Sequence, residues 1–60
     1  MNSEILVIDD NPDLRFIVCN ILKDKSFSVR SAANYDQAVL EINKKLPDLA
    51  VIDIKLDKAD

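Results

Sequence analysis

Apolar residues follow two kinds of pattern along the chain, and the two kinds alternate. Short apolar runs within residues 4–8 and 48–53 are rich in β-branched and aliphatic side chains, which is typical of strands covered on both faces of a parallel sheet. Residues 12–24 and 34–45 repeat apolar side chains at helical spacing. Residues 27–30 alternate apolar and polar side chains, as a strand near a sheet edge does. The chain is therefore predicted to fold as strand–helix–strand–helix–strand.

Local signals mark the ends of the two predicted helices. Asn11 suits the N-cap of the first helix, and Pro12 suits its first position, where no amide hydrogen is needed. Asn34 and Gln37 have the spacing of a capping box at the start of the second helix. The chain contains no glycine, so the first helix must end near residues 25–26 without the left-handed glycine that commonly follows a helix.

Each predicted helix also has an apolar stripe that should pack on the sheet. Apolar side chains at i, i+3 and i+4 spacing lie on one face of a helix. In the first helix this stripe contains Leu14, Ile17, Val18, Ile21 and Leu22. In the second helix we expect Tyr35, Ala38, Val39 and Ile42 to be buried.

Aspartates stand at the carboxyl ends of both long apolar runs. Asp9 and Asp10 end the first run, and Asp53 ends the last. If these runs are neighbouring parallel strands, their carboxyl ends meet at one edge, where open α/β sheets bind ligands. Three carboxylates in such proximity repel one another, so the arrangement is physically reasonable mainly with a divalent cation. The pattern therefore favours a cation site made of these three acids.

A purely structural explanation is available for each acid taken alone. Asp9 and Asp10 precede a predicted helix, whose dipole favours negative charge at its start. Asp13 suits that structural role well, and we leave it out of the site. Asp53 alone would be explained as the polar end of a buried strand. The three acids together favour the functional interpretation.

Composition narrows the class of protein. With 60 residues the chain allows one small domain, and a domain of this size buries only about 60% of its unfolded surface. A hydrophobic content of 48% argues against disorder. The net charge of −3, with no stripe of Lys and Arg, gives no electrostatic basis for direct nucleic-acid binding by this segment. The single Cys19 favours a reducing, cytoplasmic setting, and no apolar stretch approaches the roughly 18 residues that a membrane span requires.

These features together resemble the N-terminal half of the receiver domains of two-component response regulators. The resemblance rests on the apolar strand ending at residues 9–10, on the Asn-Pro pair at residues 11–12, and on the apolar strand ending at Asp53. One helix–strand–helix unit separates the two strand ends. The resemblance implies a flavodoxin-like α/β half-domain of βαβαβ form with a parallel sheet in the order 2-1-3. We expect residues 1–60 to be one receiver domain, truncated after the third strand.

The resemblance also implies a function as a phosphoacceptor in a phosphorelay, and not as an enzyme. Asp53 matches the aspartate that accepts a phosphoryl group from a histidine kinase or phosphotransfer protein. A carboxylate can act as a nucleophile toward phosphorus and form an acyl phosphate. Asp9 and Asp10 match the acidic pair that holds Mg²⁺, to which the acceptor itself and the backbone carbonyl of Lys55 also contribute.

Some expected features of a receiver are missing from the sequence. Asp57 stands where a proline is usual, and the later strands that carry a Ser/Thr switch residue and a phosphoryl-binding lysine do not follow. We therefore expect little stable phosphorylation of the sixty residues alone. The alternative function is a truncated, non-phosphorylatable interaction module, a homodimer through strand 48–53. A phosphohydrolase of the haloacid dehalogenase type is disfavoured, because Asp53 is followed by Ile54-Lys55 rather than by the second aspartate of an Asp-x-Asp motif.

Overall fold

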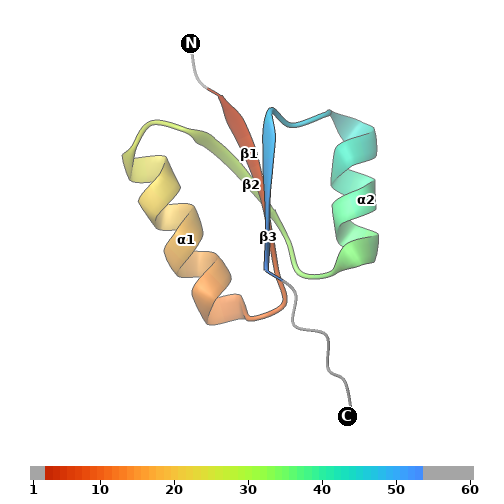
Figure 1. Cartoon of the computed structure of the whole chain (residues 1–60), viewed down its shortest axis with the longest axis horizontal. Helices are drawn as coiled ribbons and strands as arrows, with labels where there is room; N and C mark the ends of the chain where they lie inside the picture. Colours follow the sequence, from red (N-terminus) through yellow and green to blue (C-terminus); the bar gives the residue numbers. More distant parts are fainter. Residues whose placement is uncertain (1–2, 54–60) are drawn as a thin grey trace.

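The computed structural model describes residues 3–53, which form a three-stranded sheet with one helix on each face (Figure 1). In chain order the elements are β1 (Glu4–Asp9), α1 (Pro12–Asp24), β2 (Ser28–Ala32), α2 (Tyr35–Lys44) and β3 (Leu49–Asp53). All strand pairs are parallel, and β1 lies in the middle of the order β2-β1-β3. The predicted alternation of elements and the predicted strand order are confirmed. Neither helix of the described segment has the length and apolar character needed to cross a membrane.

The core is centred on β1. Five of its six residues, Ile5 to Asp9, are buried. Leu6 and Ile8 join Ala32 of β2 and Ala38 of α2 in one apolar cluster. Successive residues of a strand point to opposite faces. The residues of β1 on either side of Leu6 and Ile8 therefore point to the other face of the sheet, which α1 covers. The central strand is thus covered by a helix on each face and a strand on each side.

Both helices begin at the asparagines that the sequence indicates. The side-chain oxygen of Asn11 accepts hydrogen bonds from the amides of Asp13 and Leu14, at 2.9 and 3.2 Å. The side-chain oxygen of Asn34 accepts from the amide of Gln37 at 2.8 Å. The side-chain oxygen of Gln37 accepts in turn from the amide of the residue before the N-cap, at 2.8 Å, and not from the amide of the N-cap itself. Both predicted caps are therefore confirmed, the second as a variant of the capping box.

The end of α1 explains why β2 differs from its predicted bounds. Ser26 has a φ of 72°, so a serine occupies the left-handed position that glycine usually takes. The amide of Phe27 then donates back to the carbonyl of Leu22 at 3.2 Å. Phe27 is thereby part of the helix end, and β2 begins one residue later and extends to Ala32. The predicted strand over 27–30 was two residues too short at its far end.

The apolar stripes of the helices are more exposed than we expected. No residue of α1 is buried, and Ile17 and Ile21 are each 51% exposed. In α2 only Ala38 is buried, whereas Tyr35 is 70% and Val39 48% exposed. Within the described residues both helices contact β1 and β2, and neither contacts β3. The predicted burial is wrong for these side chains because two strands are too narrow a platform to cover a whole helix face.

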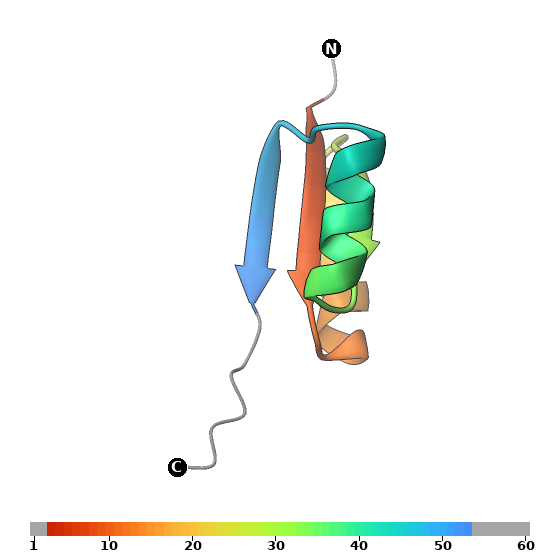
Figure 2. The same ribbon diagram turned by 90° about the vertical axis from the view of Figure 1, so that its right-hand side faces the viewer.

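Strand β3 is the outer strand on the side away from the helices (Figure 2). All five of its residues are exposed, including Leu49 at 57% and Ile52 at 61%. The prediction that this apolar run would be covered on both faces is wrong for the described part of the chain. Its strand conformation comes from backbone pairing with β1 alone.

Candidate functional site

The carboxyl ends of β1 and β3 place the candidate acids at one edge of the sheet. Asp9 and Asp53 are register partners on neighbouring parallel strands, and Asp10 follows Asp9 directly. Asp9 is buried, with 3% of its surface exposed. Asp10 and Asp53 are both exposed. The edge therefore combines one buried acid with two acids that solvent or a partner can reach.

Asp9 is held by the start of α1. Its side-chain Oδ1 accepts a hydrogen bond from the amide of Asn11 at 2.9 Å. Its backbone carbonyl accepts a second bond from Nη1 of Arg15, also at 2.9 Å. An amide at a helix start carries partial positive charge, which favours a carboxylate beside it. These bonds fix the end of β1 against the first turns of α1 and orient the buried carboxylate.

The donor set at this edge consists of oxygen atoms, the ligands that Mg²⁺ prefers. Within residues 3–53 no three His, Cys, Asp or Glu side chains form a group that could hold a metal ion. Mg²⁺ usually keeps several waters and takes only one or two protein carboxylates, together with substrate oxygens. Carboxylates on two adjacent strand ends fit that chemistry. Lys55, the predicted backbone ligand, and Asp57 lie outside the described residues.

The register that sets Asp53 beside Asp9 is fixed at the opposite end of the two strands. The amide of Glu4 donates to Oδ2 of Asp48 at 2.7 Å. The amide of Asp48 donates in return to the carbonyl of Glu4 at 2.8 Å. This reciprocal pair joins the start of β1 to the residue preceding β3. Because a parallel ladder continues in step from its start, the two bonds also align the acids at the far end.

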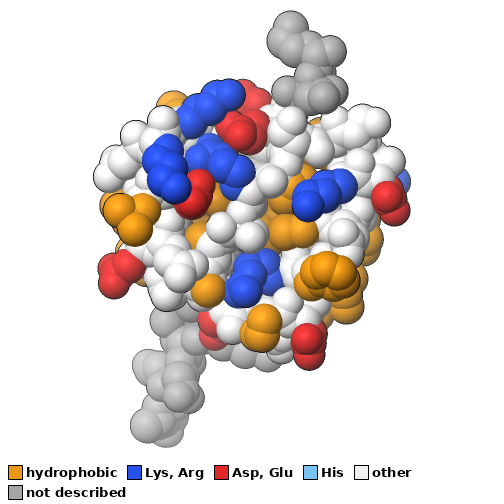
Figure 3. Space-filling view, turned by 180° about the vertical axis from the view of Figure 1, so that it is seen from behind, with side chains coloured by type: hydrophobic (Ala, Val, Ile, Leu, Met, Phe, Trp, Pro, Cys, Tyr) orange, Lys and Arg blue, Asp and Glu red, His pale blue; other side chains and the backbone are white. Residues whose placement is uncertain are grey.

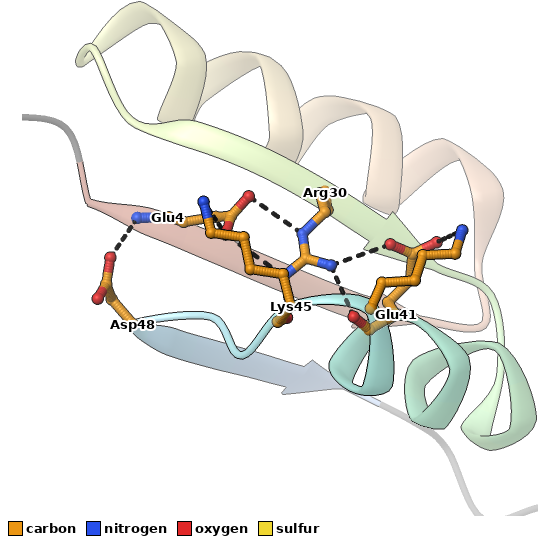
Figure 4. A network of polar contacts seen from close by, with 6 residues as sticks. Glu4, Arg30, Glu41, Lys45 and Asp48 are labelled. Atoms are coloured by element: carbon orange, nitrogen blue, oxygen red, sulfur yellow. Dashed lines mark hydrogen bonds and ion pairs between the residues drawn. The ribbon is translucent and has the colours of Figure 1, made fainter.

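An ion-pair network around Arg30 lies on the α2 face of the sheet (Figure 4). The Nε of Arg30 is 3.1 Å from Oε2 of Glu4, and its Nη1 is 3.1 Å from Oε1 of Glu41. Nε is buried without an aligned hydrogen bond, so its contact with Glu4 is a charge–charge interaction. The guanidinium also donates to the backbone carbonyls of Glu41, at 2.7 Å, and Lys45, at 2.6 Å. One side chain thus joins β1, β2 and the end of α2.

The same network acts on the ionisation of Glu41. Side-chain hydrogen bonds from Lys44 and then from Arg30 hold the pKa of Glu41 below its ordinary value of 4.5. Our sequence analysis missed this network. One signal was available in the sequence. Side chains of the second strand alternate between the two faces of the sheet, so Arg30 lies on the face opposite Val29. That face is covered by the helix that carries Glu41. Arg30 donates to the carbonyl of Lys45 at the end of the helix, and it adds a second bond to the carbonyl of Glu41, which already accepts from the amide of Lys45.

Comparison with known proteins agrees with this geometry. Residues 5–60 match the family model described as "Response regulator receiver domain". The chain belongs to this family of receiver domains. The resemblance inferred from the strand-end acids is therefore confirmed.

Individual relatives are regulators and a phosphotransferase of bacteria. The chain is 41% identical to the nitrogen assimilation regulatory protein NtrX of Azorhizobium caulinodans, over 93% of the chain and 12% of that protein. It is 38% identical to the phosphate regulon transcriptional regulatory protein PhoB of Escherichia coli, over 88% of the chain and 23% of that protein. It is 32% identical to sporulation initiation phosphotransferase F of Bacillus subtilis, over 100% of the chain and 48% of that protein. The chain thus spans less than half of each of these relatives. No solved structure was found to match it.

Proposed function

We propose that this chain is the phosphoacceptor part of a two-component signalling protein. Asp53 accepts the phosphoryl group, and the donor is the phosphohistidine of a histidine kinase or phosphotransfer protein. The observation that carries the proposal is the register pairing of Asp9 with Asp53 at the ligand-binding edge of a receiver-type sheet.

The surroundings of the acids favour Asp53 over Asp9 as the nucleophile. A carboxylate oxygen of Asp53 attacks phosphorus, a P–O bond forms, and the P–N bond to the histidine breaks. The electron pair of that bond stays on the imidazole nitrogen, and an acyl phosphate remains on Asp53. Asp53 is exposed, so a second protein can reach it. Asp9 is buried and already accepts a bond from the amide of Asn11.

Mg²⁺ belongs to the same proposal. Asp10 and Asp53 supply its side-chain oxygens, Asp9 assists directly or through water, and the carbonyl of Lys55 is a further ligand. When bound, the ion neutralises charge on the transferred phosphoryl group. This is needed because three aspartates at one edge repel an incoming anion.

The acceptor is tested by labelling with acetyl phosphate and Mg²⁺, followed by intact-mass measurement. The sample is the full protein encoded by the reading frame that contains these residues. We expect a gain of one phosphate in the wild type and none in Asp53→Asn. Asp36→Asn is the matched control, since Asp36 is another exposed aspartate, in the first turn of α2. Labelling that persists in Asp53→Asn, or is lost in Asp36→Asn as well, contradicts the assignment.

The exposure of β3 favours a second proposal, that its outer edge pairs with a copy of itself. Leu49 and Ile52 leave apolar surface on an edge strand, which is a template for a further strand. Antiparallel pairing of two copies about a two-fold axis gives a continuous sheet. Light scattering of the chain at micromolar concentration tests this. A dimer that Leu49→Lys converts to monomer supports it, and a folded wild-type monomer contradicts it.

A further inference from the structure

A shallow groove lies between α1 and β2, on the side of the sheet away from β3. Its free volume is about 270 Å³. Six residues form most of its lining, namely Arg15, Phe16, Cys19 and Lys23 of α1 with Val29 and Ser31 of β2. Figure 3 looks onto this side of the molecule and shows hydrophobic side chains gathered between separate Lys and Arg side chains.

The groove is apolar in the middle and cationic toward both ends. Phe16 is 69% exposed, and Cys19 is half-buried and midway along the helix segment. Arg15 and Lys23 lie two turns apart on α1, a separation of roughly 12 Å at 1.5 Å per residue. No Asp or Glu is among the lining residues. In a chain of net charge −3, this is a locally positive surface.

The positive charge of the groove is available to a ligand. Arg15 donates to the backbone carbonyl of Asp9, which is a neutral group. This bond therefore leaves the positive charge of Arg15 uncompensated. Lys23 lies in the last turn of α1, and its neighbour Asp24 is not among the lining residues. Arg30 also borders the groove, but Glu4 and Glu41 already compensate its charge. The attraction for an anion therefore comes from Arg15 and Lys23.

The strand beside the groove can accept another strand. β2 is an edge of the described sheet, and an edge presents backbone N–H and C=O groups to an added chain. A strand rises about 3.3 Å per residue, and every second side chain points to the same face. Two side chains four residues apart are thus about 13 Å apart, close to the separation of Arg15 and Lys23. The side chain midway between them lies over the apolar part of the groove.

We propose that the groove binds an extended acidic segment of a partner protein, paired along β2. The segment carries an acid at one position, an apolar residue two positions later, and a second acid two positions further. The acids meet Arg15 and Lys23, and the apolar side chain enters the depression beside Phe16 and Cys19. The groove lies at the opposite edge of the sheet from β3, so this binding does not depend on the acceptor Asp53.

Two synthetic nonapeptides test the proposal. The first has two glutamates flanking a leucine at the stated spacing, and the second has lysines in place of the glutamates. Fluorescence anisotropy with the sixty-residue chain measures affinity, and amide chemical shifts locate the bound peptide. We expect the acidic peptide to bind at least about tenfold more tightly, a difference of about 1.4 kcal/mol, with shifts at Val29 and Ser31. Equal affinity for the two peptides, or shifts centred on β3, overturns the proposal.

Variants with matched controls separate the groove from general charge and hydrophobicity. Lys23→Glu should lower the affinity for the acidic peptide at least about tenfold. Lys25→Glu makes the same charge change outside the groove and should change that affinity little. Phe16→Ala should also weaken binding, and Tyr35→Ala removes an equally exposed ring, 70% against 69%, from the other helix. Asp53→Asn should bind as the wild type does. Equal losses within either matched pair overturn the proposal.

Discussion

Strands β1 and β3 have nearly the same sequence and opposite surroundings. Residues 5–9 read Ile-Leu-Val-Ile-Asp, and they pair one to one with residues 49–53, Leu-Ala-Val-Ile-Asp. All five of these β1 residues are buried, and all five β3 residues are exposed. β1 has a strand on each side and a helix over each face, whereas β3 has only β1 beside it and no helix contact within the described residues. The apolar pattern specifies a strand, but neighbouring elements decide whether it is buried.

The same contrast separates the surroundings of the aspartates that end the two strands. Asp9 ends the buried strand and is bonded to the start of α1, so it is fixed in place. Asp53 ends the exposed strand and is open to a second protein. A site that combines a fixed acid with an accessible one suits a reaction in which a group arrives from outside and must be oriented.

The largest expected effect comes from truncating one leucine in each of the two strands. Leu6 is fully buried, so Leu6→Ala should lower the free energy of unfolding by about 2–5 kcal/mol. Leu49 is 57% exposed, so Leu49→Ala should cost less than about 1 kcal/mol. Urea unfolding followed by circular dichroism measures both values. Equal losses would mean that β3 is as well covered as β1.

A second effect tests how α2 is fastened over β1 and β2. Arg30→Met keeps the apolar stem but removes the cation that joins Glu4 to Glu41, and it removes the donors to two carbonyls at the end of α2. We expect a loss of about 1–3 kcal/mol. Lys44→Met is the control. The side chain of Lys44 is 70% exposed, so its ion pair with Glu41 should contribute less than about 1 kcal/mol to stability. A loss in Arg30→Met no larger than in the control would show that the network is only a surface feature.

A smaller effect concerns the end of α1, and here the change should be stabilising. Ser26 has a left-handed backbone with a φ of 72°, which glycine adopts without steric cost. Ser26→Gly should therefore raise the free energy of unfolding by up to about 1 kcal/mol. Thermal unfolding of the variant and wild type measures the difference. A destabilised variant would show that the entropy of glycine in the unfolded chain outweighs the relief at this position.

The smallest effect is a pH dependence at Glu41. Its pKa is lowered in the folded chain by Lys44 and Arg30, so its stabilising contribution is complete above the ordinary value of 4.5. The contribution is lost as the pH falls below 4.5 through the lowered folded value. The stability difference between wild type and Glu41→Gln should therefore shrink over that range and stay constant above it. A difference that does not change with pH would contradict the lowered pKa.

The sequence was sufficient for the elements that depend on short-range chemistry. Asn11 and Asn34 marked both helix starts, and the apolar runs marked the two strands that end in Asp9 and Asp53. The strand order came from the resemblance to receiver domains. The sequence was insufficient where the outcome depends on which elements meet. The periodicity of α2 does not reveal that Tyr35 is 70% exposed on a helix that contacts only β1 and β2 within the described residues. The Arg30 network and the groove beside β2 arise from side chains of separate elements. The alternation of β2 indicates the face on which Arg30 lies, but it does not identify the residues that Arg30 contacts.

One magnesium titration tests most directly whether the ends of β1 and β3 form a single site. Amide resonances of Asp10 and Asp53 are followed together as Mg²⁺ is added. Both should shift with one common dissociation constant, and Asp53→Asn should weaken the response at Asp10 as well as at its own position. Separate dissociation constants for the two amides, or unchanged Mg²⁺ binding in an Asp10→Asn/Asp53→Asn double variant, would contradict a shared site.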